Sequence, residues 1–142
     1  MLRLLRERPA DADEVEALLD HAFAPGREAL SSYQLRAGVA PVHALCTIAR
    51  DEYDAVIGAI RYWPVQIARG EDQPSLPTLL LGPVAVHATR QGEGLGALLV
   101  MDSLEEATRL GWHRVLLVGD EPYYRRFGFR RALAVGLDFP RP

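Results

Sequence analysis

The chain has 142 residues, a net charge of −3 and a hydrophobic fraction of 49%. This length fits one domain with a single core, so we expect one domain over residues 1–142. The acidic balance argues against a nucleic-acid partner, and no apolar run approaches the ~20 residues of a membrane helix. The N-terminal residues become charged too soon for a secretory signal. We therefore expect a cytoplasmic protein.

The residue inventory excludes several kinds of site. All sixteen basic residues are arginine, so no lysine can follow the glycines of a Walker-type phosphate loop. The single cysteine, Cys46, excludes an intrachain disulfide and a cysteine-rich zinc site, and its apolar surroundings predict a core residue. His21, His43 and His113 lack metal-ligand spacing, so we expect no metal.

The first part of the chain predicts a strand and two helices. Leu2–Leu5 has the composition of a short strand. Asp11, followed three residues later by Glu14, is typical of a helix N-cap with its reciprocal partner, and the apolar spacing carries this helix to about Phe23. The weaker amphipathic segment Arg27–Arg36 predicts a second helix.

A hairpin is predicted next. Apolar residues alternate over Val42–Ala49, Asp51–Asp54 is a turn signal, and Ala55–Trp63 is a second strand, which together indicate an antiparallel pair. Pro64 should end or distort the second strand. The polar segment Ala68–Pro77 is expected to be a loop.

The stretch Leu79–Leu110 organises the chain. It predicts a strand, a short connection, three glycines and a long amphipathic helix, in that order. The strand itself is expected to begin one residue earlier, at Thr78. Gly92, Gly94 and Gly96 open this helix, where unpaired N–H groups and the positive end of the dipole favour an anion. The absence of side chains there lets a large ligand approach the backbone.

The same helix has two predicted faces and a predicted end. Its solvent face holds Asp102, Glu105, Glu106 and Arg109. Its inner face is expected to hold Leu98, Met101, Leu104 and Ala107. Gly111 is a natural C-terminal cap.

The last part of the chain completes an α/β order. Arg114–Val118 is a short apolar strand that follows a helix, so it should run parallel to the strand before the glycines. A turn of helix over Tyr123–Phe127 follows, and Leu133–Phe139 supplies one final strand. We expect a mixed sheet of about six strands flanked by helices.

Spaced glycines also occur in Rossmann-type dinucleotide turns. Those turns usually follow the first strand and precede an acidic residue about 20 positions further on. Here the glycines follow the fourth predicted strand, and the corresponding later position is Arg114. The Rossmann alternative is therefore disfavoured.

Two motifs resemble a known family. Gln91-Gly92-Glu93-Gly94-Leu95-Gly96 is similar to the Gln/Arg-x-x-Gly-x-Gly/Ala signature of the GCN5-related N-acetyltransferases, with Val84–His87 directly before it. Tyr123–Phe129 resembles that family's second signature, a tyrosine before a Gly-Phe turn. LGPVAVH and GDxxYYxRFGF are most similar to bacterial predicted acetyltransferases. The resemblance covers nearly the whole chain and implies an acetyl-CoA-dependent N-acetyltransferase.

The resemblance also implies a coenzyme site. The pyrophosphate would lie on backbone N–H groups from Gln91 to Ala97, and the pantetheine arm would run beside a strand made irregular at Gly82-Pro83. By position, the Val84 N–H would face the thioester carbonyl and stabilise its oxyanion. The coenzyme residues implied are Val84, Ala85, Val86, Gln91, Gly92, Glu93, Gly94, Leu95, Gly96, Ala97, Tyr124 and Arg126. Arg90 is a second candidate for the phosphates.

Tyr124 aligns with the family's general acid. A tyrosine of ordinary pKa, about 10, is protonated at neutral pH, as a proton donor must be. Tyr123 is interpreted as a packing residue. No base is evident, because Leu80 and Gly82 stand where some members place one.

Two other side chains are candidates for handling the acceptor's proton. Asp120 follows the next strand, where it can bind a cationic amine, relay through water, or simply cap the short helix. His87 is interpreted as structural.

Two functions stay open from the sequence. One is acetyl transfer to a primary amine of a small molecule or peptide, in a pocket near the first two helices. The alternative is a non-catalytic acyl-CoA-binding or regulatory module. Relative to the family, the last strand is missing, so we expect an open sheet edge or a homodimer that covers it.

Overall fold

The computed structural model describes residues 2–23, 35–132 and 136–137. These form a five-stranded sheet in the order β1-β2-β3-β4-β5. The strands are β1 (Arg3–Arg6), β2 (Thr47–Arg50), β3 (Val56–Ile67), β4 (Leu76–Val86) and β5 (Val115–Leu117). The first four are antiparallel neighbours and β5 joins β4 in parallel, which confirms the mixed sheet. The helix expected over Arg27–Arg36 and the strand expected over Leu133–Phe139 fall largely outside the described residues.

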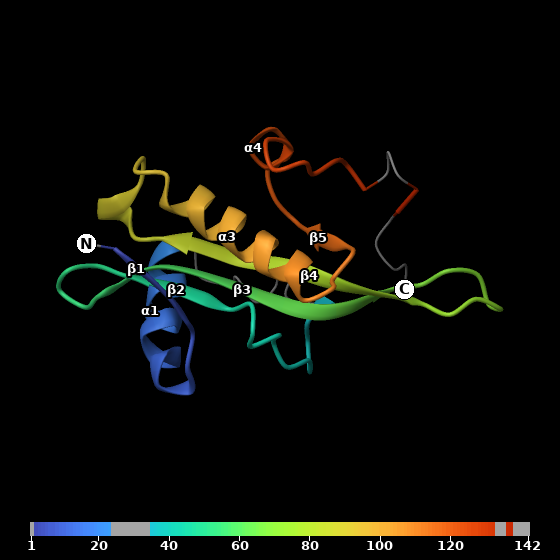
Figure 1. Ribbon diagram of the computed structural model, residues 1–142, viewed down its shortest axis with the longest axis horizontal. Helices are drawn as coiled ribbons and strands as arrows, with labels where there is room; N and C mark the ends of the chain where they lie inside the picture. The colour runs from blue at the N-terminus through green and yellow to red at the C-terminus, as the bar shows by residue number, and fades with distance from the viewer. Residues whose placement is uncertain (1, 24–34, 133–135, 138–142) are drawn as a thin grey trace.

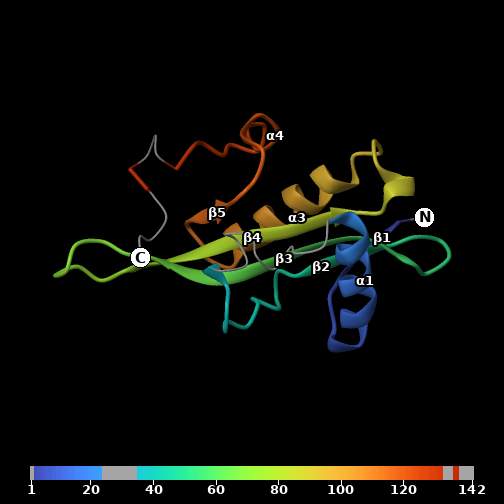
Figure 2. The same cartoon turned by 180° about the vertical axis from the view of Figure 1, so that it is seen from behind.

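Helices cover both faces of the sheet (Figures 1 and 2). On one face, α1 (Ala12–Ala22), preceded by the short η1 (Pro9–Asp11), buries Val15, Leu18 and Leu19 against Ile48 and Ala59. On the other face, α3 (Leu95–Arg109) buries Leu95 and Leu99 in a second cluster with Ile60 and Tyr62. The short helix α4 (Glu121–Arg125) follows β5 on the α3 side. Each amphipathic element thus turns its apolar face to the sheet.

Two predictions about the first half of the fold are wrong in part. The strand predicted from Val42 begins only at Thr47, because the Leu45 N–H donates to the Val42 carbonyl in a turn. Cys46 beside it is buried, as expected. The helix after Asp11 forms, but the Asp11 carboxylate does not cap it.

The Asp11 carboxylate instead anchors η1 to the sheet. It accepts from the Arg8 N–H and from the Arg50 guanidinium, both at 2.8 Å, and both Asp11 and Arg50 are buried. Glu14, the expected capping partner, binds Arg50 as well. These hydrogen bonds hold the pKa of Asp11 below its usual value, the Arg8 N–H being the largest cause.

The expectation that Pro64 ends or distorts its strand is also wrong. β3 continues through Pro64, opposite Leu79, to Ile67. Its pairing with β2 reaches only to Ile60, so within the described sheet the rest of β3 pairs with β4 alone. Proline is tolerated there because the missing N–H can face an edge without a ladder partner. The β3–β4 hairpin projects beyond the rest of the sheet (Figure 2).

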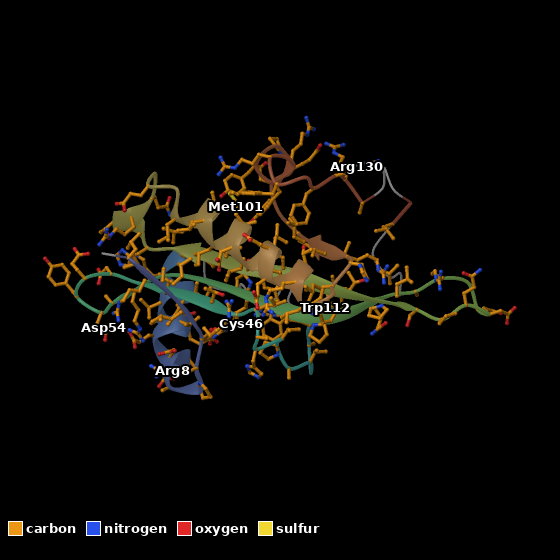
Figure 3. All side chains as sticks on the ribbon, in the orientation of Figure 1. Arg8, Cys46, Asp54, Met101, Trp112 and Arg130 are labelled. Carbon is orange, nitrogen blue, oxygen red and sulfur yellow. The ribbon has the colours of Figure 1, made fainter. Side chains whose placement is uncertain are left out.

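The inner face of α3 differs from the prediction. The buried positions are Leu95, Leu99, Val100, Ser103 and Ala107, which mostly follow a spacing of four residues. Leu98 is 46% exposed and Met101 60% exposed, so those two are wrongly predicted as core. Met101 lies on the outer side of the helix, toward α4, as Figure 3 shows. The parallel β5 and the glycine after α3 are as predicted, with Gly111 at a φ of 92°.

Candidate functional site

The bulge in β4 decides which side chains reach the site. Leu81 pairs with Tyr62 and Val84 pairs with Ile60, so Gly82 and Pro83 together stand opposite Arg61 alone. This confirms the expected irregularity, and the Gly82-Pro83 peptide is cis. One extra residue in a strand moves the side chains that follow it to the opposite face of the sheet. Val84 therefore packs on the α3 side with Tyr62 and Leu81, whereas Ala85 is buried beneath α1.

The connection from β4 to α3 is built from short-range hydrogen bonds and left-handed glycines. His87 caps the short helix η3 (Ala88–Arg90), because its ring accepts from the Thr89 N–H. Gly92 and Gly94 have φ of 85° and 79°, a region that strongly favours glycine. Gly94 is the N-cap of α3, and its carbonyl accepts the first helical bond from the Leu98 N–H. The preceding N–H groups of the first turn have no partner within the helix and can bind an anion.

A cavity of about 520 Å³ lies where β4, the first turn of α3 and α4 meet. It is lined by Val84, Val86, Arg90, Gln91, Gly92, Gly94, Leu95, Gly96, Ala97, Tyr123, Tyr124 and Arg126. The structure thus brings together the two predicted motifs. Of the predicted coenzyme residues, Ala85 and Glu93 do not line the cavity, since Ala85 faces α1 and the Glu93 carboxylate pairs with Arg90 at 3.4 Å.

Tyr123 contributes to the cavity, although the sequence suggested only a packing role. A Cβ built on Gly96 would lie 3.4 Å from the Tyr123 hydroxyl, so this hydroxyl lies over the first turn of α3. The sequence did carry an indication of this, because Tyr123 is next to Tyr124 in a short predicted helix. Neighbouring side chains of a helix point about 100° apart, so both can border one cavity.

The two arginines of the cavity differ in their partners. Arg90 pairs with Asp51, Glu52 and Glu93 at 3.4–3.5 Å. The Arg126 guanidinium lies 4.3 Å from the centre of the Tyr123 ring, and among the described residues no carboxylate is within ion-pair distance of it. Arg126 is therefore the cation of this cavity whose charge is available to a bound anion.

Comparison with known proteins decides the family. A model of the acetyltransferase (GNAT) domain matches residues 42–131, which include the bulged strand, the glycine turn and α4. The chain belongs to the GNAT acetyltransferase family. A curated relative, the uncharacterized N-acetyltransferase YhbS of Escherichia coli strain K12, is 34% identical over 126 residues, which are 89% of this chain and 72% of the relative.

Solved GNAT structures have the same fold. A GNAT family acetyltransferase from Brucella melitensis in complex with acetyl-CoA is 32% identical, has a TM-score of 0.72, and matches over 99% of this chain and 92% of its own. Escherichia coli YhbS in complex with CoA is 31% identical with a TM-score of 0.73, over 95% of this chain and 70% of its own.

Tyr124 of this GNAT domain is held tightly against Gly119, which follows β5. A Cβ on Gly119 would lie 2.6 Å from the Tyr124 ring, so only glycine permits this approach. The ring also packs edge-on against Tyr123 and Phe129, with centroids 5.0 and 6.0 Å away. Burial, followed by the neighbouring Tyr123 and Asp120, raises the pKa of Tyr124. The hydroxyl is therefore protonated at neutral pH.

Asp120 is placed as a helix cap. Its carboxylate accepts from the Tyr123 N–H at 3.3 Å, at the start of α4, and it is not among the residues that line the cavity. Among the described residues, no group of three or more potential ligands could hold a metal ion. Within that same part of the chain, no helix is long and apolar enough to span a membrane.

Proposed function

We propose that the chain transfers an acetyl group from acetyl-CoA to the primary amine of a small molecule or peptide by direct attack. One observation carries the proposal: a single cavity joins the strand beyond the β4 bulge, the N-terminal turn of α3 and Tyr124. The donors suit the coenzyme, because a pyrophosphate is favoured both by the first N–H groups of α3 and by Arg126, which pairs with no carboxylate of the described residues. The coenzyme supplies the activated acetyl thioester.

The chain's own residues would act on the atoms that gain charge. The Val84 N–H would donate to the thioester oxygen as the amine attacks, an interaction that can contribute ~3–4 kcal/mol to transition-state stabilisation. The Tyr124 hydroxyl would give its proton to the departing thiolate, and its raised pKa suits that role. Asp120 would act, if at all, through water, because its carboxylate caps α4.

A specific observation favours the second candidate, a non-catalytic coenzyme-binding module. The described residues that line the cavity include no carboxylate and no histidine, so none of them can take the proton of the amine. An active enzyme would then rely on water or on the acceptor's own neutral fraction.

A thiol-release assay with acetyl-CoA and a panel of polyamines, amino acids, aminoglycosides and peptides separates the two. Turnover on any acceptor supports the enzyme. Binding of CoA by calorimetry with no turnover on the whole panel supports the module.

We also propose a homodimer in which a second copy covers β5. In the described sheet β5 is an end strand, paired only with β4, and such edges readily pair with another chain. Light scattering at high protein concentration tests this, and a strictly monomeric species would contradict it. The location in the cell is proposed as cytoplasmic on sequence grounds alone.

A further inference from the structure

One side chain links β3 directly to the bulge of β4. The Trp63 indole N–H donates to the Gly82 carbonyl at 2.6 Å, and Trp63 is only 9% exposed. Trp63 pairs with Leu80, two residues before Gly82. The Arg36 guanidinium lies 4.2 Å from the centre of the Trp63 ring. The indole is thus held on one side by a cation and tied at its nitrogen to the bulge.

The Gly82 carbonyl needs such a donor. A bulge interrupts the ladder, so the extra residue cannot make the regular cross-strand bonds, and a backbone acceptor in a half-buried position requires a partner. Gly82 also has a φ of 132°, which glycine adopts readily because it lacks a Cβ, and the same lack leaves its backbone freer than that of its neighbours. The Trp63 hydrogen bond therefore disfavours other conformations of β4, in which the Gly82 carbonyl would point in another direction.

The position of the bulge controls the site. The extra residue is what directs Val84 to the α3 side, and a one-residue slip would place it on the α1 side. We propose that Trp63 is a positioning residue for acetyl transfer: its indole N–H fixes the Gly82 carbonyl, and thereby aims the Val84 N–H at the reacting carbonyl. The expected effect on acetyl transfer rests on the proposed function. The expected effect on the position of the bulge rests on the geometry of β4 alone.

The test removes one N–H without changing shape. The chain has two tryptophans, and in a Trp112→Phe background the remaining one, Trp63, can be replaced by β-(3-benzothienyl)alanine, in which sulfur takes the place of the indole N–H. The matched control is the Trp112→Phe protein with its natural Trp63. Trp112 itself lies at the turn between α3 and β5 (Figure 3). Trp63→Phe, with Trp112→Phe as its control, is the simpler genetic version.

Two readouts are used. With the best acceptor of the panel, we expect kcat to fall about tenfold on loss of the N–H, while the Kd for CoA changes less than about twofold. In ¹⁵N-valine-labelled protein, we expect the Val84 and Val86 amide signals to shift and those of Val100 and Val115 to stay.

Unmoved Val84 and Val86 signals, or an unchanged kcat, would overturn the inference. An equal loss of kcat and CoA affinity would also overturn it, because a generally loosened fold predicts that result. If the unmodified protein has no turnover on any acceptor, the proposed function fails, and the amide signals alone then decide whether Trp63 fixes the bulge.

Discussion

The two ends of α3 allow the glycine turn to be tested against an internal control. Gly94 at the N-cap and Gly111 just beyond the C-cap both have left-handed backbones, with φ of 79° and 92°, and a Cβ on either would meet nothing within 4 Å. Gly94→Ala and Gly111→Ala therefore introduce the same conformational penalty at opposite ends of one helix. Only Gly94 borders the cavity.

The expected magnitudes follow from the backbone. Alanine in the left-handed region costs roughly 1–2 kcal/mol, so both variants should lose about that much free energy of unfolding. In Gly94→Ala the turn also relaxes away from the conformation that aims the first N–H groups of α3. Losing one hydrogen bond to a charged phosphate costs about 1.5–3 kcal/mol, so CoA should bind about 10- to 100-fold more weakly.

The assay pairs denaturant unfolding with calorimetric titration of CoA, on the same preparations. Gly111→Ala should show the stability loss with nearly unchanged affinity. Equal losses of affinity in the two variants would refute the reasoning, because helix stability rather than the N-terminal turn would then govern binding. Unchanged affinity in Gly94→Ala would refute it too.

Three further predictions concern single side chains. Tyr124→Phe should lower kcat about 100-fold with little change in CoA affinity, whereas Tyr53→Phe, at an 82% exposed position, should change neither. Because the pKa of Tyr124 is raised, the loss of activity that its ionisation causes should set in at a higher pH than for a tyrosine of ordinary pKa, about 10. Arg126→Gln should weaken CoA binding about 5- to 10-fold at low salt and less at high salt, while Arg125→Gln, whose charge is paired with Glu121, should not. Asp11→Asn should lower the free energy of unfolding by about 3 kcal/mol at pH 7. Because the pKa of Asp11 is lowered in the folded state, this difference should be fully present above the ordinary aspartate pKa of about 3.9 and should shrink as the pH falls from there through the folded-state pKa. A difference that stays unchanged down to pH 2 would contradict the assignment.

The bulge, the glycine turn and the parallel strand were predictable because their signals are local. Gly92 and Gly94 adopt left-handed backbones that favour glycine, and the Gly82-Pro83 pair marks the bulge in its strand. The parallel β5 follows from the intervening helix. Such features depend on residues adjacent in sequence, and they were correctly placed.

The failures have tertiary causes. Pro64 was expected to end or distort its strand, but an absent N–H matters only where a neighbouring strand would accept from it, and the pairing of β2 with β3 stops at Ile60. Asp11 has the spacing of a cap, yet the distant Arg50 takes its carboxylate into a buried pair. Met101 is apolar but lies toward α4, so helical periodicity alone misassigned its face. In each case, a partner far away in the sequence determines the outcome.

The central claim, that the β4 bulge, the α3 turn and α4 form one acetyl-CoA site, is tested most directly by a crystal structure of the complex with acetyl-CoA. We expect the pyrophosphate on the backbone N–H groups between Gln91 and Ala97, and the thioester oxygen within hydrogen-bonding distance of the Val84 N–H. A coenzyme bound elsewhere, or a thioester remote from both Val84 and Tyr124, would contradict it.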